Sequence, residues 1–327
     1  MNAPASEERL EQLRDKAWQE GVVPGRGVDV VGGPIPRKPG YYGQPVVKPP
    51  VWTWEIPLYF FFGGIAGMSA VIAFVALLFD QVDLSRAAMW LAAITGAVLS
   101  PILLIMDLGR PHLFLHMLRV FKHRSPMSMG AWILTAFGMC AVPGLIALEL
   151  HSHQVFPGTL DRLLSFAAGI LILAAATFGT LLATYTGVLI GATAIPAWFL
   201  HRTLLPIHFG TAGLGSAAAA LELFGYRISA LNFIGFYAAA VETILLIWLS
   251  VAKHGAADRA IHEHGSGWII RISEVLSGPL ALILRSFGFI PWAAISFLAG
   301  ALAGRFGWIA VGKVSGADPE SVFASQR

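Results

Sequence analysis

The chain has 327 residues, of which 56% are hydrophobic and only 13% are charged, whereas soluble globular domains are about 25% charged. Together with a mean hydropathy of +0.68, this composition excludes an ordinary soluble enzyme and predicts a membrane protein. The formal net charge of +3 gives no indication of nucleic acid as a partner, and a single cysteine, Cys140, leaves no internal disulfide.

The first fifty residues predict an extended arm rather than a packed domain. Residues 1–21 are charged and lack the apolar core of a signal peptide, and they favour a short amphipathic helix over about residues 6–19. The Pro- and Gly-rich stretch over 22–50 cannot build a hydrophobic core. We therefore expect residues 1–50 to form a partly disordered cytoplasmic arm, either free or lying along a partner protein.

Residues 51–313 predict an all-α integral membrane protein, because about 20 predominantly apolar residues are needed to cross a bilayer and lipid-embedded backbone groups must be satisfied internally. One stretch, 266–285, carries Arg271 and Glu274 and predicts either a short bent span or an interfacial helix. We favour eight spans over seven, followed by a C-terminal tail over 314–327. The predicted spans are 57–79, 87–106, 129–150, 163–190, 196–222, 229–252, 266–285 and 290–311.

Lysine and arginine are distributed unevenly between the two sides of this predicted bundle. The second side carries only Arg86, Arg162 and Arg227. Because cytoplasmic loops are enriched in Lys and Arg, we expect the N-terminus and the loop between the second and third spans to face the cytoplasm of a bacterial inner membrane. The first side carries Arg9, Arg14, Lys16, Arg26, Arg37, Lys38, Lys48, Arg110, Arg119, Lys122, Arg124, Arg202, Lys253, Arg259 and Arg271.

Charged side chains at the membrane are the functional candidates, since they are costly in lipid. Asp107 and Arg110, in MDLGRPHLF (106–114), lie three residues apart at the end of the second span, where they can pair. The negative end of the helix dipole disfavours the Asp107 charge, and Pro111 ends the helix at Arg110. We expect a fixed polar corner here, with a purely structural cap as the competing interpretation.

Other polar and aromatic residues are expected in the same layer of the membrane. Such a layer suits the head of a quinone, since its carbonyls need hydrogen-bond donors, its ring packs on apolar side chains and its reduction takes up protons. A belt of interfacial Tyr and Trp is the alternative explanation. The expected quinone-binding set is Glu55, Tyr59, Asp107, Arg110, Tyr185, Trp198 and His201.

Histidine is scarce within the spans, where only His208 is clearly intramembrane. A di-haem bundle needs paired histidines and an iron–sulfur cluster usually needs four thiolates, so we expect no haem, no iron–sulfur cluster and no metal in this chain. Glu149 and Glu222 end their spans on the outer face, where solvation explains them. Glu242 lies within the sixth span and is a candidate for a proton path.

Several segments together resemble the NrfD/PsrC family, the membrane subunits of polysulfide-reductase-like complexes. The resemblance covers about residues 41–320, with its motifs in the family's order. YYGQPVVKPP (41–50) is similar to members that accompany formate-dehydrogenase-like molybdenum or tungsten enzymes. The segments that carry the resemblance are WTWEIPLYFFFGGIAGMSA (52–70), MDLGRPHLFLHML (106–118), SPMSMGAW (125–132), YTGVLIGATAIPAW (185–198) with the following LLP, and GRFGWIAVGKVSGADP (304–319).

This resemblance implies a subunit without a redox cofactor of its own that binds menaquinone or ubiquinone. It implies a ferredoxin-like iron–sulfur subunit docked at the same membrane face, which exchanges electrons with a molybdopterin catalytic subunit. It places Tyr185 near the quinone and the loop of Asp107 and Arg110 on the docking side. Some relatives use a histidine at the start of the first span, where this chain offers Glu55 or Trp54.

The leading hypothesis is therefore a quinone-reactive membrane subunit of a multi-subunit oxidoreductase. Asp107 and Tyr185 would hydrogen-bond the quinone or supply protons. A passive membrane anchor and a proton-translocating, transporter-like subunit remain as alternatives. The residues expected to dock an acidic partner surface are Arg110, His112, Arg119, Lys122 and Arg124.

Overall fold

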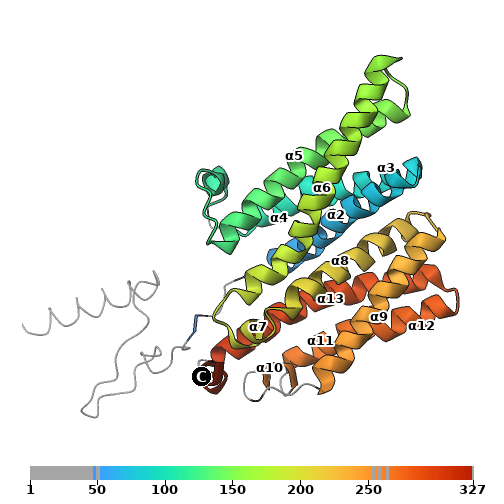
Figure 1. Ribbon diagram of the computed structural model, residues 1–327. Helices are drawn as coiled ribbons and strands as arrows, with labels where there is room; N and C mark the ends of the chain where they lie inside the picture. Colours follow the sequence, from blue (N-terminus) through green and yellow to red (C-terminus); the bar gives the residue numbers. More distant parts are fainter. Residues whose placement is uncertain are drawn as a thin grey trace, which may run out of the picture. The chain divides into compact units, whose positions relative to one another are not determined.

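The structure, a computed structural model, describes residues 47–48, 52–108, 110–251, 255, 259–262 and 265–325. The predicted helix over 6–19 lies outside these residues, as does the rest of the predicted arm over 1–50 except 47–48. The chain divides into two units, Met1–Lys48 and Pro49–Arg327. The described part of the second unit is a bundle of helices that contains no strand (Figure 1).

Within the described residues, eight helices are long and apolar enough to cross a membrane. The predicted all-α membrane fold is confirmed, and the weak stretch over 266–285 is a span rather than an interfacial helix, since it forms one helical run from Gly265 to Ser286. The spans are α2 (Glu55–Leu78), α3–η2–α4 (Val82–Ala92, Ala93–Leu99, Ser100–Met106), α5 (Pro126–Ser152), α6 (Thr159–Gly191), α8 (Leu204–Leu223), α9 (Ser229–Val251), α11–η5–α12 (Gly265–Val275, Leu276–Leu280, Ala281–Ser286) and α13 (Ile290–Ala317).

The predicted fifth span is wrong in one respect, because residues 196–222 do not form one helix. A separate short helix, α7, precedes α8, and the chain turns between them at residues 201–203. The last span runs to Ala317, and residues of the predicted tail continue as a further short helix. The shorter elements are the 3₁₀ helix η3 (Pro111–Leu118), α7 (Pro196–Leu200), α10 (Arg259–His262) and α14 (Pro319–Ser325).

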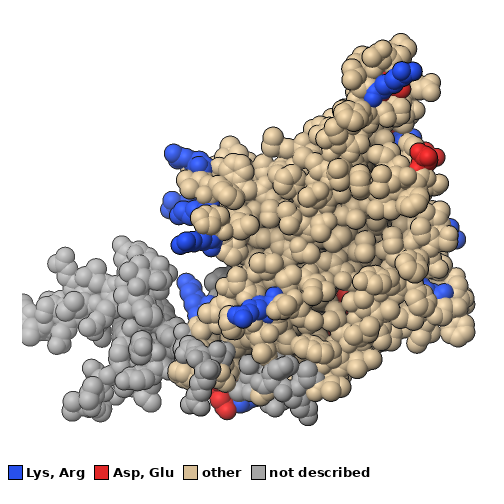
Figure 2. Space-filling model, viewed as in Figure 1, with Lys and Arg blue, Asp and Glu red and all other residues tan. Residues whose placement is uncertain are grey.

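The spans pack as two groups, α2 to α6 and α8 to α13, which meet where α2 and α6 lie against α8 (Figure 1). At one end of the bundle α2 begins and α4 and α6 end; we call this the basic end. Figure 2 shows Lys and Arg side chains gathered there and a middle band with almost no charged atoms at the surface. The charge layers agree with a bundle that crosses a membrane.

Two of the spans are distorted close to a proline. The π-helical segment η2 directly precedes α4, which has Pro101 in its first turn, and η5 contains Pro279. Proline has no N–H to donate to the preceding helical turn, so the α-helical hydrogen-bond pattern is interrupted there. The interruption in the second span lies in the wall of a groove described below.

Helices α2 and α6 approach so closely at Gly67 and Gly179 that only glycine fits. A Cβ atom at Gly179 would lie 2.9 Å from the Cα atom of Gly67 and 2.5 Å from its carbonyl oxygen. Small residues of this kind are the usual basis of close helix packing in lipid.

Replacing Gly179 with alanine should therefore destabilise the bundle by about 1–3 kcal/mol, the usual cost of overpacking. The measurement is unfolding of the purified protein by titration with SDS. Gly169→Ala is the matched control on the same helix, because a Cβ there meets nothing within 4 Å. Equal stability of the two variants would show that the helices separate at little cost.

Candidate functional site

A small cavity of about 60 Å³ lies at the basic end, between the first group of helices and the loop that follows α4. Three predicted site residues, Tyr59, Asp107 and Tyr185, line it together although they come from three different helical segments. The other residues of its wall are Trp52, Ile56, Phe60, Leu104, Leu108, Met117, Met127, Gly130, Ala131 and Leu189.

The two tyrosines place unsatisfied hydroxyl groups at this cavity. Their side chains are buried, with only 3% of Tyr59 and 8% of Tyr185 exposed. No hydrogen bond joins either hydroxyl to another described residue, and neither oxygen is among the fully enclosed polar atoms that lack a partner, so both remain accessible from the cavity. Two such donors facing one cavity can serve a ligand that accepts hydrogen bonds.

Asp107 supplies an ionisable group at the end of α4, where it is the C-cap residue. Burial and the neighbouring Glu55 carboxylate raise the pKa of Asp107 above its ordinary value, and hydrogen bonds from Thr53 partly offset the rise. The same Thr53 hydroxyl is also within hydrogen-bond reach of Glu55, and with a single proton it donates to only one of the two carboxyl groups at a time. The carboxyl group is therefore held in a setting that favours retention of a proton.

The expected pairing of Asp107 with Arg110 does not occur in the described part of the chain. The backbone of Arg110 has left the helical region, with φ at −136°, and its side chain is exposed. The helix stops before the residue that precedes Pro111, so the three-residue spacing no longer places the two side chains on one face. Thr53 is the partner of Asp107 instead.

Trp52 forms a wall of the cavity that the sequence interpretation did not assign. Its ring stacks on Trp198 at 5.7 Å between centroids, and its carbonyl accepts a hydrogen bond of 2.7 Å from Lys313 Nζ. The Trp198 indole in turn donates to the carbonyl of Trp308 at 2.7 Å. Trp54, considered from the sequence, is instead 51% exposed.

Four residues of the expected quinone-binding set do not line the cavity: Glu55, Arg110, Trp198 and His201. Trp198 is fully buried against Trp52, and His201 packs edge-on against Trp248 and Trp308. Arg110 is exposed in the loop after α4. Glu55 also stays outside the wall, and acts on the cavity through its charge next to Asp107.

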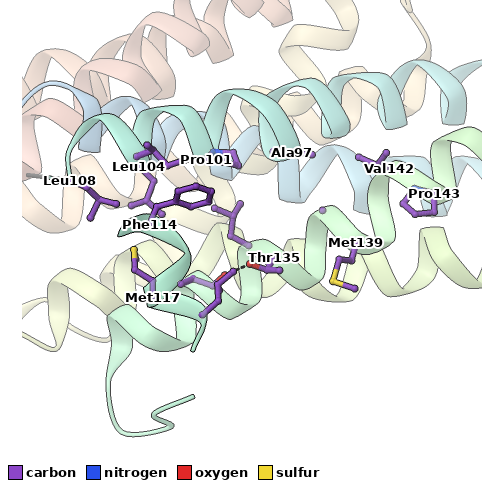
Figure 3. A pocket seen from close by; sticks show the side chains of 16 residues that line it. Ala97, Pro101, Leu104, Leu108, Phe114, Met117, Thr135, Met139, Val142 and Pro143 are labelled. Atoms are coloured by element: carbon purple, nitrogen blue, oxygen red, sulfur yellow. Dashed lines mark hydrogen bonds between the residues drawn. The ribbon is translucent and has the colours of Figure 1, made fainter. Parts of the chain in front are cut away.

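A larger apolar groove of about 470 Å³ adjoins the cavity, and its volume falls in the range of about 300–1,000 Å³ typical of ligand pockets. It shares four residues with the cavity wall. Figure 3 shows it running between the second span and α5, from Leu108 and Phe114 to Val142 and Pro143. Gly96, Ala97 and Pro101, at the distorted part of the second span, form one side. The shared residues are Leu104, Leu108, Met117 and Ala131.

Comparison with known proteins identifies the family. The family model described as "Polysulphide reductase, NrfD" matches residues 44–317. The chain belongs to the NrfD family. None of the curated proteins with which it was compared matches it. In this NrfD protein, the matched range contains all eight spans and every residue of the cavity and the groove.

The loop between the second and third spans of this NrfD protein presents charge and apolar surface together. All five basic residues expected to dock a partner are exposed: Arg110, His112, Arg119, Lys122 and Arg124. Leu115, Val120 and Phe121 are each more than half exposed beside them. Exposed apolar side chains rimmed by charge are typical of a protein interaction surface.

Solvation does not explain Glu222, contrary to the sequence interpretation. Arg285 donates two hydrogen bonds of 2.7 Å to its carboxylate, both side chains are at most 1% exposed, and Asn232 accepts from the same guanidinium. Glu149 likewise accepts from Arg86 and Trp90 near the surface. The signal that was missed is Arg285, a charged residue at the end of a predicted span.

Proposed function

We propose that this chain is the quinone-reactive membrane subunit of a multi-subunit oxidoreductase of the bacterial inner membrane. A ferredoxin-like iron–sulfur partner exchanges electrons with menaquinone or ubiquinone at the basic end, and a molybdopterin subunit, such as one of formate-dehydrogenase type, carries out catalysis. The observation that supports this most is the pair of unpartnered phenols that lines one cavity with Asp107. Membership of the NrfD family supports the kind of complex.

The polar cavity and the adjoining apolar groove together fit a molecule with a small polar head and a long apolar tail. Tyr59 and Tyr185 donate hydrogen bonds to the quinone carbonyls, and Asp107 supplies a proton as the quinone is reduced. The polyprenyl tail lies in the apolar groove. The polar cavity alone is smaller than a quinone ring requires, and the flexible side chains of Met117 and Met127 in its wall make room for the head.

The basic loop with its exposed apolar residues docks an acidic surface of the iron–sulfur partner. This brings the partner's cluster to the end of the bundle where the cavity lies. The positive-inside rule then places the partner, the loop and the N-terminus in the cytoplasm. A reporter fused to the N-terminus and found outside the membrane would contradict this orientation.

Purification of the complex through a tag on this chain tests the proposal. We expect iron and molybdenum to co-purify, and electron transfer from the substrate to both soluble dyes and quinone in lipid. A passive anchor would give full activity with dyes and none with quinone. The two assays therefore separate the two alternatives on the same sample.

Gly130→Ala should impair quinone turnover although it replaces no ionisable side chain. A Cβ at Gly130 would overlap the phenol ring and hydroxyl of Tyr185, so the phenol must leave its place in the cavity. Displacement of a positioned group by about 1 Å can cost roughly 100-fold in rate, and we expect a loss of that order with quinone. Gly169→Ala on α6 is the control, because its Cβ would meet nothing within 4 Å and the residue lines neither the cavity nor the groove. Equal quinone rates in both variants would exclude a role for the Tyr185 position.

Glu55→Gln should shift the pH profile of quinone turnover to lower pH. The Glu55 charge helps to raise the pKa of Asp107, so its removal lowers that pKa and Asp107 loses its proton at lower pH. The alkaline limb of the pH profile with quinone should move to lower pH, while the pH profile of the dye assay should stay unchanged. A limb that moves to higher pH would contradict the assignment of Asp107 as the proton donor.

A further inference from the structure

Four ionisable side chains meet inside the second helix group, one from each of four helices. His208 lies on α8, Glu242 on α9, Glu274 on α11 and Arg305 on α13, and each is at most 5% exposed. We call this set the four-helix cluster. None of its members lines the cavity or the groove. From the sequence, His208 and Glu274 were noted within predicted spans, but only Glu242 was given a possible role. Arg305, within the predicted span 290–311, was a signal that the sequence interpretation did not use.

The imidazole of His208 lies between the two carboxyl groups. Its Nδ1 atom is 3.2 Å from Glu242 Oε2 and its Nε2 atom is 3.9 Å from Glu274 Oε1. One ligand atom from each of the three residues falls within 4.8 Å of the others. Both carboxyl groups are also within electrostatic reach of Arg305, whose guanidinium donates to the carbonyl of Phe209 and lies 3.7 Å from the centre of its ring.

Charge balance decides what such a cluster holds. Two carboxylates this close in a dry interior repel each other, and one guanidinium neutralises only one of them. With a neutral imidazole the set carries one excess negative charge. Binding of one proton makes the net charge of the cluster zero. Binding of a divalent metal ion would instead give the cluster a net charge of +1, which no other described group of the cluster balances.

The polar atoms that remain unpaired point to the same conclusion. Within the described residues, His208 Nδ1, Glu242 Oε1, Glu274 Oε2 and Arg305 Nε have no hydrogen-bond partner, although each is buried. Unpaired buried polar atoms require an explanation. A carboxylate cannot donate a hydrogen bond, but a protonated carboxyl group can. A proton bound to one of the two carboxyl groups therefore adds a hydrogen-bond donor to a cluster in which acceptor atoms predominate.

We propose that the four-helix cluster is a binding site for one exchangeable proton, shared by Glu242 and Glu274 and distinct from the quinone cavity. His208 connects the two acids. An O–H proton of Glu242 transfers to Nδ1, and the proton on Nε2 passes to Glu274, so that the imidazole returns to neutrality and one proton has moved between the carboxyl groups. No redox change is involved.

Infrared difference spectroscopy of the purified complex in lipid tests this proposal. We expect the wild type to show the C=O stretch of a protonated carboxylic acid, with a shift to lower frequency in D₂O. In an Asp107→Asn background, which removes the other carboxyl group expected to hold a proton, Glu242→Gln and Glu274→Gln should each abolish that band, because the single remaining carboxyl group of the cluster pairs with Arg305 and ionises. Glu149→Gln is the matched control and should keep the band, since Arg86 already holds Glu149 as a carboxylate.

Three results would overturn the proposal. They are the absence of the band from the wild type, its survival in either cluster variant, and its loss in Glu149→Gln. Metal analysis of the same samples provides a fourth criterion, because a tightly bound metal ion that disappears in Glu242→Gln would replace the proton as the ligand. The resting complex is measured without quinone, so failure here leaves the proposed quinone function untouched.

Discussion

Replacing Asp107 with asparagine and Tyr185 with phenylalanine together should nearly abolish quinone turnover by the purified complex. The double variant keeps the shape of the cavity but removes its ionisable carboxyl group and one of its two unpartnered hydroxyls. A positioned proton donor contributes roughly 10²–10⁴-fold to a rate, so we expect a loss of at least about 100-fold. The measurement is the rate of substrate oxidation or reduction with quinone in lipid vesicles.

The same preparation must retain its activity with soluble dyes, which shows that the partner subunits are still attached and active. Tyr237→Phe, an exposed tyrosine on α9, combined with Asp161→Asn on α6 provides a control of equal chemistry away from the cavity. Unchanged quinone turnover in the Asp107 and Tyr185 variant would refute the site. Loss of both activities would instead indicate that the complex had come apart.

Replacing Glu222 with methionine should cause the largest loss of stability among the charged residues of the bundle. The change leaves the Arg285 guanidinium buried with only Asn232 as a side-chain acceptor. Removing one partner of a buried ion pair costs about 3–5 kcal/mol. The free energy of unfolding, measured by SDS titration of the purified protein, should fall by that amount.

The double variant with methionine at both Glu222 and Arg285 should regain most of this loss, because no isolated charge remains and the replacement is apolar. Glu149→Gln serves as the comparison near the surface. There the pair with Arg86 is partly exposed, and such pairs contribute about 1 kcal/mol or less. A Glu222→Met variant as stable as the wild type would mean that water reaches Arg285.

The course of the spans was predictable because each depends on a local property, the length of an apolar run. Even the segment over 266–285, with Arg271 and Glu274, forms a span, since its helix turns Glu274 toward the four-helix cluster rather than toward lipid. The break between α7 and α8 has a signal in the polar residues His201, Arg202 and Thr203, where the chain turns, but the apolar sequence on both sides led to one span being predicted over 196–222.

The candidate site was predictable in its residue types and in its layer, but not in its exact wall. Tyr59, Asp107 and Tyr185 were identified because polar groups beside apolar sequence are costly and conspicuous. Trp52 was not assigned although it lines the cavity, and Trp198 and His201 lie outside its wall. Several aromatic residues occur in the same part of the sequence, and the sequence does not tell which way each side chain points. Arg285 and Arg305 were overlooked because their partners come from distant helices.

The wall that Trp52 provides has a consequence for how the protein is made. Its carbonyl is held by Lys313, and the ring beneath it, Trp198, is anchored by the carbonyl of Trp308. Both anchors belong to α13, the last in chain order of the eight described spans. The wall of the cavity formed by the first helices is therefore complete only after α13 has been inserted, and a chain that stalls before that point would reach the membrane with Trp52 unanchored.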